Sequence, residues 1–306
     1  MQIPSAPLPA SPSYSADQIK EVVREFLSAH FNVNDWYLGA HIVRFGETLA
    51  RAAPYIRPTD RVLEAGSYGH IPLLVWRLFG PTSVYAYSLQ AGFIGFGQGA
   101  IRSEGDPRME FQCHIEAVNI ERDRWPQMDN SLDVVLCFEV LEHLREHPMF
   151  MLAEANRVLT PGGYFILTTP NSSSYRAIIN ILYHENPFIY SVYEAERGGM
   201  GHIKEYAANE LRLLFENSGF EVVTHKTFSP YKDEKDSLFP ELQVVLRKYG
   251  LVDELSGSTH FLVARKTSQP NYEYYEPLYN ITKTWSPTLP LGTVPPAVAI
   301  PGKEKK

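Results

Sequence analysis

The sequence predicts an α/β fold in which a mostly parallel sheet is covered by helices on both faces. Short apolar runs typical of buried strands alternate with segments of helical spacing through residues 58–267. The first of these runs, "RVLEAG", enters a glycine turn that opens the next helical segment. The chain has 306 residues, 44% of them hydrophobic, which is enough for one large core. In such folds ligands bind beyond the carboxyl ends of the strands.

The elements follow in order along the chain. An N-terminal unit at 16–57 has helical spacing over 17–31 and 38–53, where Ile19, Val23 and Phe26 share one face of the first helix. Strands are expected at "RVLEAG", "SVYAYS", "MEFQC", "LDVVLCF", "GYFILTTP", "FEVVTH" and "HFLVARK". The helices between them are expected at "IPLLVWRLF", with Pro72 in its first turn, and near 92–103, 147–159 and 207–218.

The remaining segments surround this domain. Residues 1–15 form a Pro/Ser/Ala leader that we expect to be flexible. A cap over 172–206 is rich in tyrosine, and an insertion over 229–256 adds a helix. The tail over 268–306 is Pro-rich but aromatic, so it is expected to pack against the body or against a partner subunit, which would give a homodimer.

Composition excludes some classes of protein. The formal net charge of -7 argues against a broad, sequence-independent grip on long nucleic acid. No apolar run reaches the ~18 residues that a membrane helix needs. Cys113 and Cys137 occur without a secretory signal, so we expect reduced thiols and a cytoplasmic protein.

Four motifs carry a resemblance to a known family: "VLEAGSYGH", "NIERDRWPQMDNSLDVVLCFEVLEHL", "RVLTPGGYFILTTPN" and "GHIKEYAANELRLLFENSGFEV". In order and spacing they resemble the class I S-adenosylmethionine-dependent methyltransferases of small-molecule and glycan pathways, over roughly residues 60–225. The resemblance implies a Rossmann-like, seven-stranded sheet whose last strand, "HFLVARK", is antiparallel and inserted next to "GYFILTT". S-adenosylmethionine is the implied cofactor.

The same resemblance assigns the cofactor-binding residues. It puts Glu64, Gly66, Ser67 and Gly69 beside the methionine part, Asn119, Ile120 and Glu121 near the adenine, Cys137, Phe138 and Glu139 at the floor, and Ser88 with Gln90 at the ribose.

The chain departs from the family at two of these positions. His70 stands where the family has the last glycine of its first motif, and Ser88 where it has an acid. A hydroxyl without charge assistance binds a ribose diol about half as strongly. We therefore expect weaker cofactor binding, or binding helped by another group. The departures also leave open a catalytically impaired binding or scaffold protein.

The stretch "FEVLEHL" holds three ionisable groups. Glu139, Glu142 and His143 would project to one side if a helical turn follows the strand. They either cap the turn and line the pocket, as in relatives without metal, or bind a cation. With His202 they resemble the metal site of small-RNA 2'-O-methyltransferases, and ubiquinone-pathway O-methyltransferases are similar over the first half.

This second reading predicts a metal site. The ligands would be Glu139, Glu142, His143 and His202 around one divalent ion, of Mg, Mn, Fe or Zn. His147 ranks below these four as a ligand, and His202 has the alternative of a loop histidine bonded to backbone.

The predicted chemistry is methyl transfer to oxygen. A divalent ion would orient vicinal oxygens and lower a hydroxyl's pKa, which favours a small sugar-like or vicinal-diol acceptor. Without metal, His143 would be the catalytic base and Glu142 would orient it. RNA 3'-terminal 2'-O-methylation remains an alternative that the acidic charge weakens. A nicotinamide-dependent oxidoreductase is disfavoured because the first turn lacks the third glycine of that fingerprint.

Overall fold

Seven strands form one sheet of order β5-β2-β1-β6-β7-β9-β8. The computed structural model describes residues 14–30, 36–88, 101–102, 110–111, 113–146, 148–189, 201–232, 234–248 and 254–272. The strands of the sheet are β1 (Arg61–Ala65), β2 (Ser83–Ser88), β5 (Cys113–Ala117), β6 (Leu132–Phe138), β7 (Leu159–Pro170), β8 (Phe220–Phe228) and β9 (Thr259–Lys266). Strand β9 runs antiparallel between β7 and β8, and the other pairings are parallel. The expected seven-stranded, mostly parallel sheet is confirmed.

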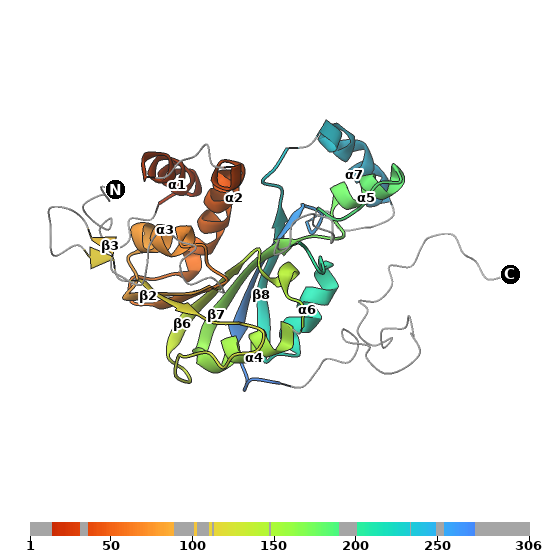
Figure 1. Ribbon diagram of the computed structural model, residues 1–306. Coiled ribbons are helices and arrows are strands. Elements are labelled where there is room, and N and C mark those ends of the chain that lie inside the picture. Colours follow the sequence, from red (N-terminus) through yellow and green to blue (C-terminus); the bar gives the residue numbers. More distant parts are fainter. Residues whose placement is uncertain are drawn as a thin grey trace.

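Helices cover both faces of this sheet (Figure 1). On one face lie α1 (Ala16–His30), α2 (Trp36–Ala52), the short η1 (Ala53–Tyr55) and α3 (His70–Phe79), and on the other lie α4 (Pro148–Val158) and α6 (Ala208–Glu216). Helix α3 begins after Gly69 and ends at Gly80, which both adopt positive φ. This pattern is typical of a strand-to-helix turn followed by a glycine C-cap.

Successive side chains along each strand point to opposite faces of the sheet, so the hydrophobic core consists of two clusters. Val62, Leu136 and Phe261 belong to the cluster under α1, α2 and α3. Leu63 and Val135 point the other way and join the cluster under α4 and α6. Each central strand is therefore buried on both faces, which explains its nearly continuous apolar sequence.

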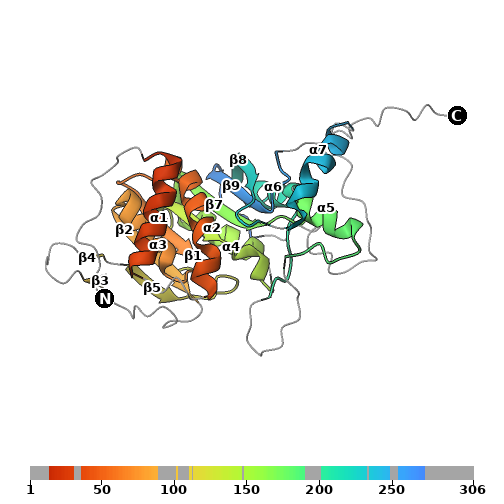
Figure 2. The same ribbon diagram turned by 90° about the horizontal axis from the view of Figure 1, so that it is seen from above.

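Three further elements lie beyond the carboxyl ends of the strands. Helices α5 (Tyr175–Leu182) and α7 (Phe239–Lys248) lie side by side, with η3 (Glu234–Leu238) leading into α7 (Figure 2). The Tyr175 and Phe239 rings meet with their centroids 5.9 Å apart. The expected helix of the insertion is thus present. None of the helices in the described ranges is long and apolar enough to cross a membrane.

Two expectations about the region before β6 are wrong. The run "MEFQC" does not supply the sheet strand, because Glu110–Phe111 (β4) pairs antiparallel with Ile101–Arg102 (β3) in a separate two-stranded sheet. The edge strand β5 begins only at Cys113. The helix expected over 92–103 also fails at its end, where residues 101–102 are the strand β3, and its other residues lie outside the described ranges.

Other expectations fall on parts of the chain that the structure does not describe. These are residues 1–13 of the leader, residues 190–200 of the cap, residues 233 and 249–253 of the insertion, residues 273–306 of the tail, Gln90 and His147. The start of the tail packs against the domain. Tyr272 donates a hydrogen bond of 2.6 Å to Glu154 of α4, and Asn271 donates one of 2.8 Å to the carbonyl of Asn217.

Candidate active site

The parallel register brings the ends of β1, β2 and β6 to one edge of the sheet. Glu64 pairs with Ala86 and Leu136, so Glu64, Ser88 and Phe138 stand near the ends of adjacent strands. The main-chain amides of Gly66 and Ser67 both donate to the carbonyl of Tyr87. This bonding turns the chain back over the edge before α3 begins.

Gly66 is required at this turn for a reason other than ligand approach. Its φ is +83°, and a Cβ at this position would lie 2.4 Å from Cγ2 of Val140. The glycine therefore lets the first turn pack against the segment that leaves β6.

Glu64 is a buried carboxyl at this edge. Burial raises its pKa to about 8, a shift partly offset by a hydrogen bond from Ser67 and by the charge of Arg44. Its Oε2 has no hydrogen-bond partner among the residues that the structure describes. A positively charged ligand would favour the ionised form, so Glu64 fits the ammonium or sulfonium of an S-adenosylmethionine methionine group.

The two departures from the family pattern have distinct surroundings. The His70 ring stacks on Phe45 of α2, with centroids 6.2 Å apart and planes 23° apart, so the imidazole is held by the N-terminal helices. Ser88 is 8% exposed, and its carbonyl accepts a bond of 3.3 Å from the amide of Val118. This bond connects the end of β2 to the loop after β5.

That loop carries the three residues expected near an adenine. The Asn119 side chain accepts a hydrogen bond of 3.0 Å from the amide of Glu121, and Ile120 is buried. The Glu121 carboxylate accepts one of 2.6 Å from the amide of Glu146. Glu121 therefore already has a main-chain partner, while Asn119 stabilises the turn.

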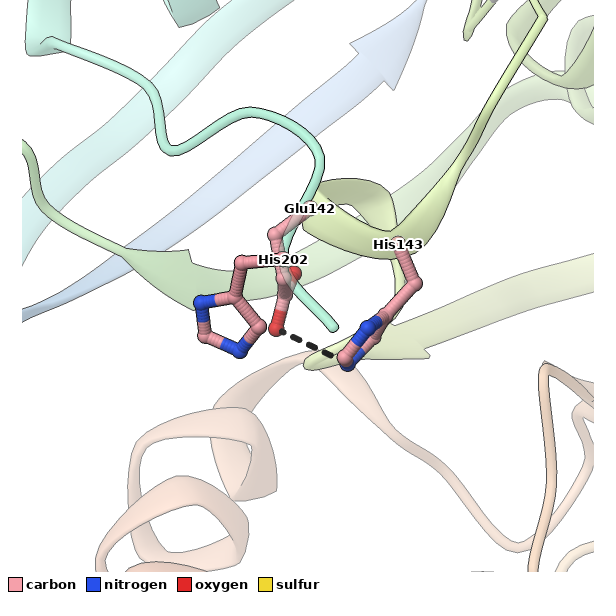
Figure 3. Close-up of side chains that lie close together, drawn as sticks. All are labelled: Glu142, His143 and His202. Atoms are coloured by element: carbon pink, nitrogen blue, oxygen red, sulfur yellow. Dashed lines mark ion pairs between the residues drawn. The ribbon is translucent and has the colours of Figure 1, made fainter. Parts of the chain in front are cut away.

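Three of the four expected metal ligands come together. Glu142 and His143 lie in the short η2 (Leu141–His143), and His202 lies in the loop before α6. One potential ligand atom from each lies within 4.8 Å of the others, and the side chains converge in Figure 3. The imidazole rings are 4.9 Å apart between centroids. Main-chain bonds hold the two loops together, because the amides of Ile203 and Lys204 both donate to the carbonyl of Glu142.

The hydrogen-bond partners of the two histidines identify which nitrogen faces the cluster. Nδ1 of His143 lies 3.2 Å from the carbonyl of Gly201, and Nδ1 of His202 lies 2.7 Å from Oε1 of Glu205. Both partners are acceptors, so we assign the proton to Nδ1 in each neutral ring. The lone pair of each ring is then on Nε2, as metal ligation requires.

Glu142 is the buried carboxyl of the cluster. Its side chain is 0% exposed, and Oε2 accepts a hydrogen bond of 2.8 Å from Thr169 at the end of β7. Oε1 lies 3.9 Å from Nε2 of His143 and has no hydrogen-bond partner within the described residues. Burial, with a further contribution from the charge of Glu139, raises the pKa of this carboxyl well above its usual range. A divalent cation would reverse this shift.

Glu139 does not join the cluster. The expectation that one helical turn runs from 139 to 143 is wrong, because η2 begins at Leu141 and Glu139 has a φ of 55°. Its carboxylate lies 3.6 Å from the guanidinium of the buried Arg44 in α2. Arg44 therefore partly neutralises the carboxylate that the family resemblance had assigned to a cation.

Sequence analysis missed three residues that shape this site: Arg44, Thr169 and Glu205. Thr169 ends a predicted strand at the ligand-binding edge, so its position was a usable signal. Arg44 looks like an ordinary helix cation, and nothing in its spacing shows that it is 3% exposed. Glu205 follows His202 by three residues in a loop without periodicity, which gave no signal.

Comparisons with known proteins identify the family of the chain and its fold. The profile of a family described as a methyltransferase domain matches residues 39–225. A Mycolicibacterium smegmatis protein named as a probable S-adenosylmethionine-dependent methyltransferase is 38% identical over 97 residues. This match spans 32% of the chain and 32% of that relative, so it covers about a third of the relative's length.

Two solved structures show the same fold. One is a methyltransferase-like chain in complex with the Trm112 methyltransferase activator of Haloferax volcanii, at a TM-score of 0.50 and 15% identity, covering 77% of this chain and 96% of that one. The other is the [4+2]-cyclase SpnF, at a TM-score of 0.50 and 16% identity, covering 84% of this chain and 99% of that one. At these identities the likeness concerns the fold alone.

Proposed function

The chain belongs to the methyltransferase-domain family, and from that membership we propose that it transfers the methyl group of S-adenosylmethionine to a hydroxyl of a small vicinal-diol or sugar-like acceptor. The observation that carries the proposal is the convergence of Glu142, His143 and His202 at the ligand-binding edge of the sheet. Two neutral imidazoles and one carboxylate form a suitable ligand set for Mg, Mn, Fe or Zn.

Residues at the ends of β1 and β2 would hold the cofactor. Glu64 supplies the negative charge for the methionine end, and the turn from Gly66 to Gly69 opens α3 beside it. Ser88 at the end of β2 would bond a ribose hydroxyl, and the loop from Asn119 to Glu121, which follows β5 beside it, would contact the adenine. When bound, S-adenosylmethionine supplies an electrophilic methyl group on a positively charged sulfur.

The reaction forms one carbon–oxygen bond as one carbon–sulfur bond breaks. The sulfur keeps the electron pair of the broken bond, and the acceptor hydroxyl loses its proton. A divalent cation held by Glu142, His143 and His202 would supply Lewis acidity toward two neighbouring acceptor oxygens. In a cation-free site, Nε2 of His143 would accept the proton, because its side chain is 23% exposed and that of His202 only 7%.

A second candidate function is that of a binding or scaffold protein which keeps the methyltransferase fold but is catalytically impaired. It is favoured by Ser88, because a hydroxyl at the ribose position lacks the charge assistance of an acid. The similar structure SpnF is named as a [4+2]-cyclase, so a protein of this fold can carry a name other than methyltransferase.

Matched acceptors test the proposal. The protein, supplied with Mn²⁺ and S-adenosylmethionine carrying a labelled methyl group, is incubated with catechol against phenol and with adenosine against 3'-deoxyadenosine. We expect labelled product from the diol of at least one pair and a loss of about tenfold or more with its single-hydroxyl partner. Equal transfer within every pair would contradict the diol preference. Cofactor binding with no transfer to any acceptor would favour the second candidate.

A further inference from the structure

We infer that Glu205 is a positioning residue, which fixes the ring of His202 so that Nε2 faces Glu142 and His143. The inference rests on the proposed cation site and adds a residue to it. The Glu205 carboxylate is buried, with its side chain 1% exposed, and Oε1 lies 2.7 Å from Nδ1 of His202. The contact joins two side chains of the loop before α6.

The position of His202 is set by two different kinds of bond. The main chain of its loop is fixed by the bonds from Ile203 and Lys204 to the carbonyl of Glu142 and by the bridge between Asn171 and Tyr206. These bonds place the Cα of His202, and the orientation of its ring about the side-chain torsions depends on side-chain contacts. The His202 ring itself is bonded through Nδ1 to the Glu205 carboxylate, which accepts the hydrogen bond.

A carboxylate on Nδ1 does more than restrict rotation. It selects the tautomer with the proton on Nδ1, an arrangement that commonly supports metal-ligating histidines. His143 has the weaker version of this support, a carbonyl 3.2 Å from Nδ1. Since a charged acceptor bonds more strongly than a neutral one, Glu205 makes His202 the better oriented of the two rings.

Glu205 is itself held in place by the segment that follows α5. The amide of Ile189 donates a hydrogen bond of 2.8 Å to the same Oε1 that accepts from His202. One oxygen thus receives two donors, from segments on either side of residues 190–200. The second oxygen, Oε2, is buried and has no hydrogen-bond partner in the described ranges. Within the described residues, the Glu205 carboxylate therefore accepts its hydrogen bonds through Oε1, the oxygen next to His202.

The first test uses the metal-free protein and does not depend on cation binding. Nitrogen-15 spectra of the histidine rings report which nitrogen carries the proton. We expect the Nδ1–H form for His202 in the wild type and a shift toward Nε2–H in Glu205→Ala. Glu205→Gln keeps the shape and an amide oxygen, so we expect a smaller change there. Glu210→Gln is the matched control, because Glu210 bonds Lys204 and the amide of Ala207 in the same loop.

The second test measures Mn²⁺ affinity by calorimetry in the same four proteins. Loss of an orienting partner typically costs 10–100-fold in metal affinity, so we expect that range for Glu205→Ala and a smaller loss for Glu205→Gln. Glu210→Gln should bind like the wild type. Unchanged His202 spectra together with Mn²⁺ affinity within twofold of wild type in folded Glu205→Ala would overturn the inference. If Glu205→Ala does not fold, unchanged spectra in Glu205→Gln overturn it.

The two tests separate this inference from the proposed function. A wild type that binds no Mn²⁺ contradicts the cation site, yet the tautomer of His202 still shows whether Glu205 positions the ring. Conversely, a wild type that binds Mn²⁺ with no dependence on Glu205 keeps the site and removes the positioning residue.

Discussion

Thr169 donates a hydrogen bond of 2.8 Å from Oγ1 to Oε2 of Glu142, so the two carboxylate oxygens of Glu142 have different surroundings. One oxygen is tied to the end of β7, and the other, Oε1, is 3.9 Å from Nε2 of His143. Because Glu142 is completely buried, its orientation depends on such contacts and not on solvent. Thr169 therefore selects the oxygen that faces the histidines.

Replacing Thr169 by Val keeps the shape of the side chain and removes this donor. The buried carboxyl then lacks a partner, so we expect the free energy of unfolding to fall by about 1–3 kcal/mol. Thr168→Val is the matched control, because Thr168 is also buried and its hydroxyl has no hydrogen-bond partner among the described residues. That control should be neutral or slightly stabilising. Urea unfolding measures the free energy of unfolding of both variants. An equal decrease in the two would contradict the role of Thr169.

Glu142 and Glu139 should differ in their effect on cation binding. After incubation with Mn²⁺ and gel filtration, elemental analysis should show bound metal in the wild type and in Glu139→Gln, and at most about a tenth of it in Glu142→Ala. The reason is that Glu139 lies beside Arg44 and outside the three-residue cluster. Equal loss in both variants would instead restore the four-ligand set that the sequence suggested. Equal metal content in wild type and Glu142→Ala would count against the site.

The contrast between these two glutamates shows what the sequence could predict. The buried strand "LDVVLCF" predicted that Glu142 and His143 would lie at the ligand-binding edge of the sheet, because the carboxyl ends of parallel strands meet at one edge. The grouping with His202 was predictable only through the family resemblance, since His202 lies far from His143 in the sequence. Glu139 was misplaced because helical spacing was assumed for a segment whose turn starts two residues later.

The region before β6 was misjudged for another physical reason. Among the described strands, β5 lies at the edge of the sheet and pairs with β2, so its sequence "CHIEA" tolerates polar residues. The preceding run "MEFQC" has the same alternation, and alternation cannot tell which of two adjacent runs joins the sheet. Central strands, buried on both faces, left no such ambiguity.

Stability of the cofactor-free protein should depend on pH through Glu64. Its pKa is raised from 4.5 to about 8, so between these values the folded state holds a proton that the unfolded state has lost. The free energy of unfolding therefore falls as pH rises through this window, by at most about 1.4 kcal/mol per pH unit. Below the unfolded-state pKa of 4.5, the stabilising contribution of Glu64 is fully present. Glu64→Gln lacks this titration. Urea unfolding at several pH values checks the sign, and a wild-type to variant difference independent of pH would contradict it.

Gly66→Ala should be more costly than an ordinary glycine replacement. The positive φ costs about 1–2 kcal/mol for an L-residue, and the overlap with Val140 adds about 1–3 kcal/mol. Gly162→Ala is the control, because Gly162 has a φ of +80° and nothing lies within 4 Å of an added Cβ. Adding Val140→Ala to Gly66→Ala should recover the second part of the loss. Thermal unfolding of the four proteins measures this, and no recovery in the double variant would show that Val140 is not the obstacle.

Calorimetric titration of the purified protein with S-adenosylmethionine tests the central claim most directly. The buried carboxyl of Glu64 and the hydroxyl of Ser88 lie at neighbouring strand ends, where the cofactor of this family would bind. A positively charged cofactor would favour the ionised form of Glu64. We predict saturable binding at one site per chain, weakened about tenfold or more in Glu64→Gln. The absence of any binding heat at millimolar S-adenosylmethionine would contradict the account.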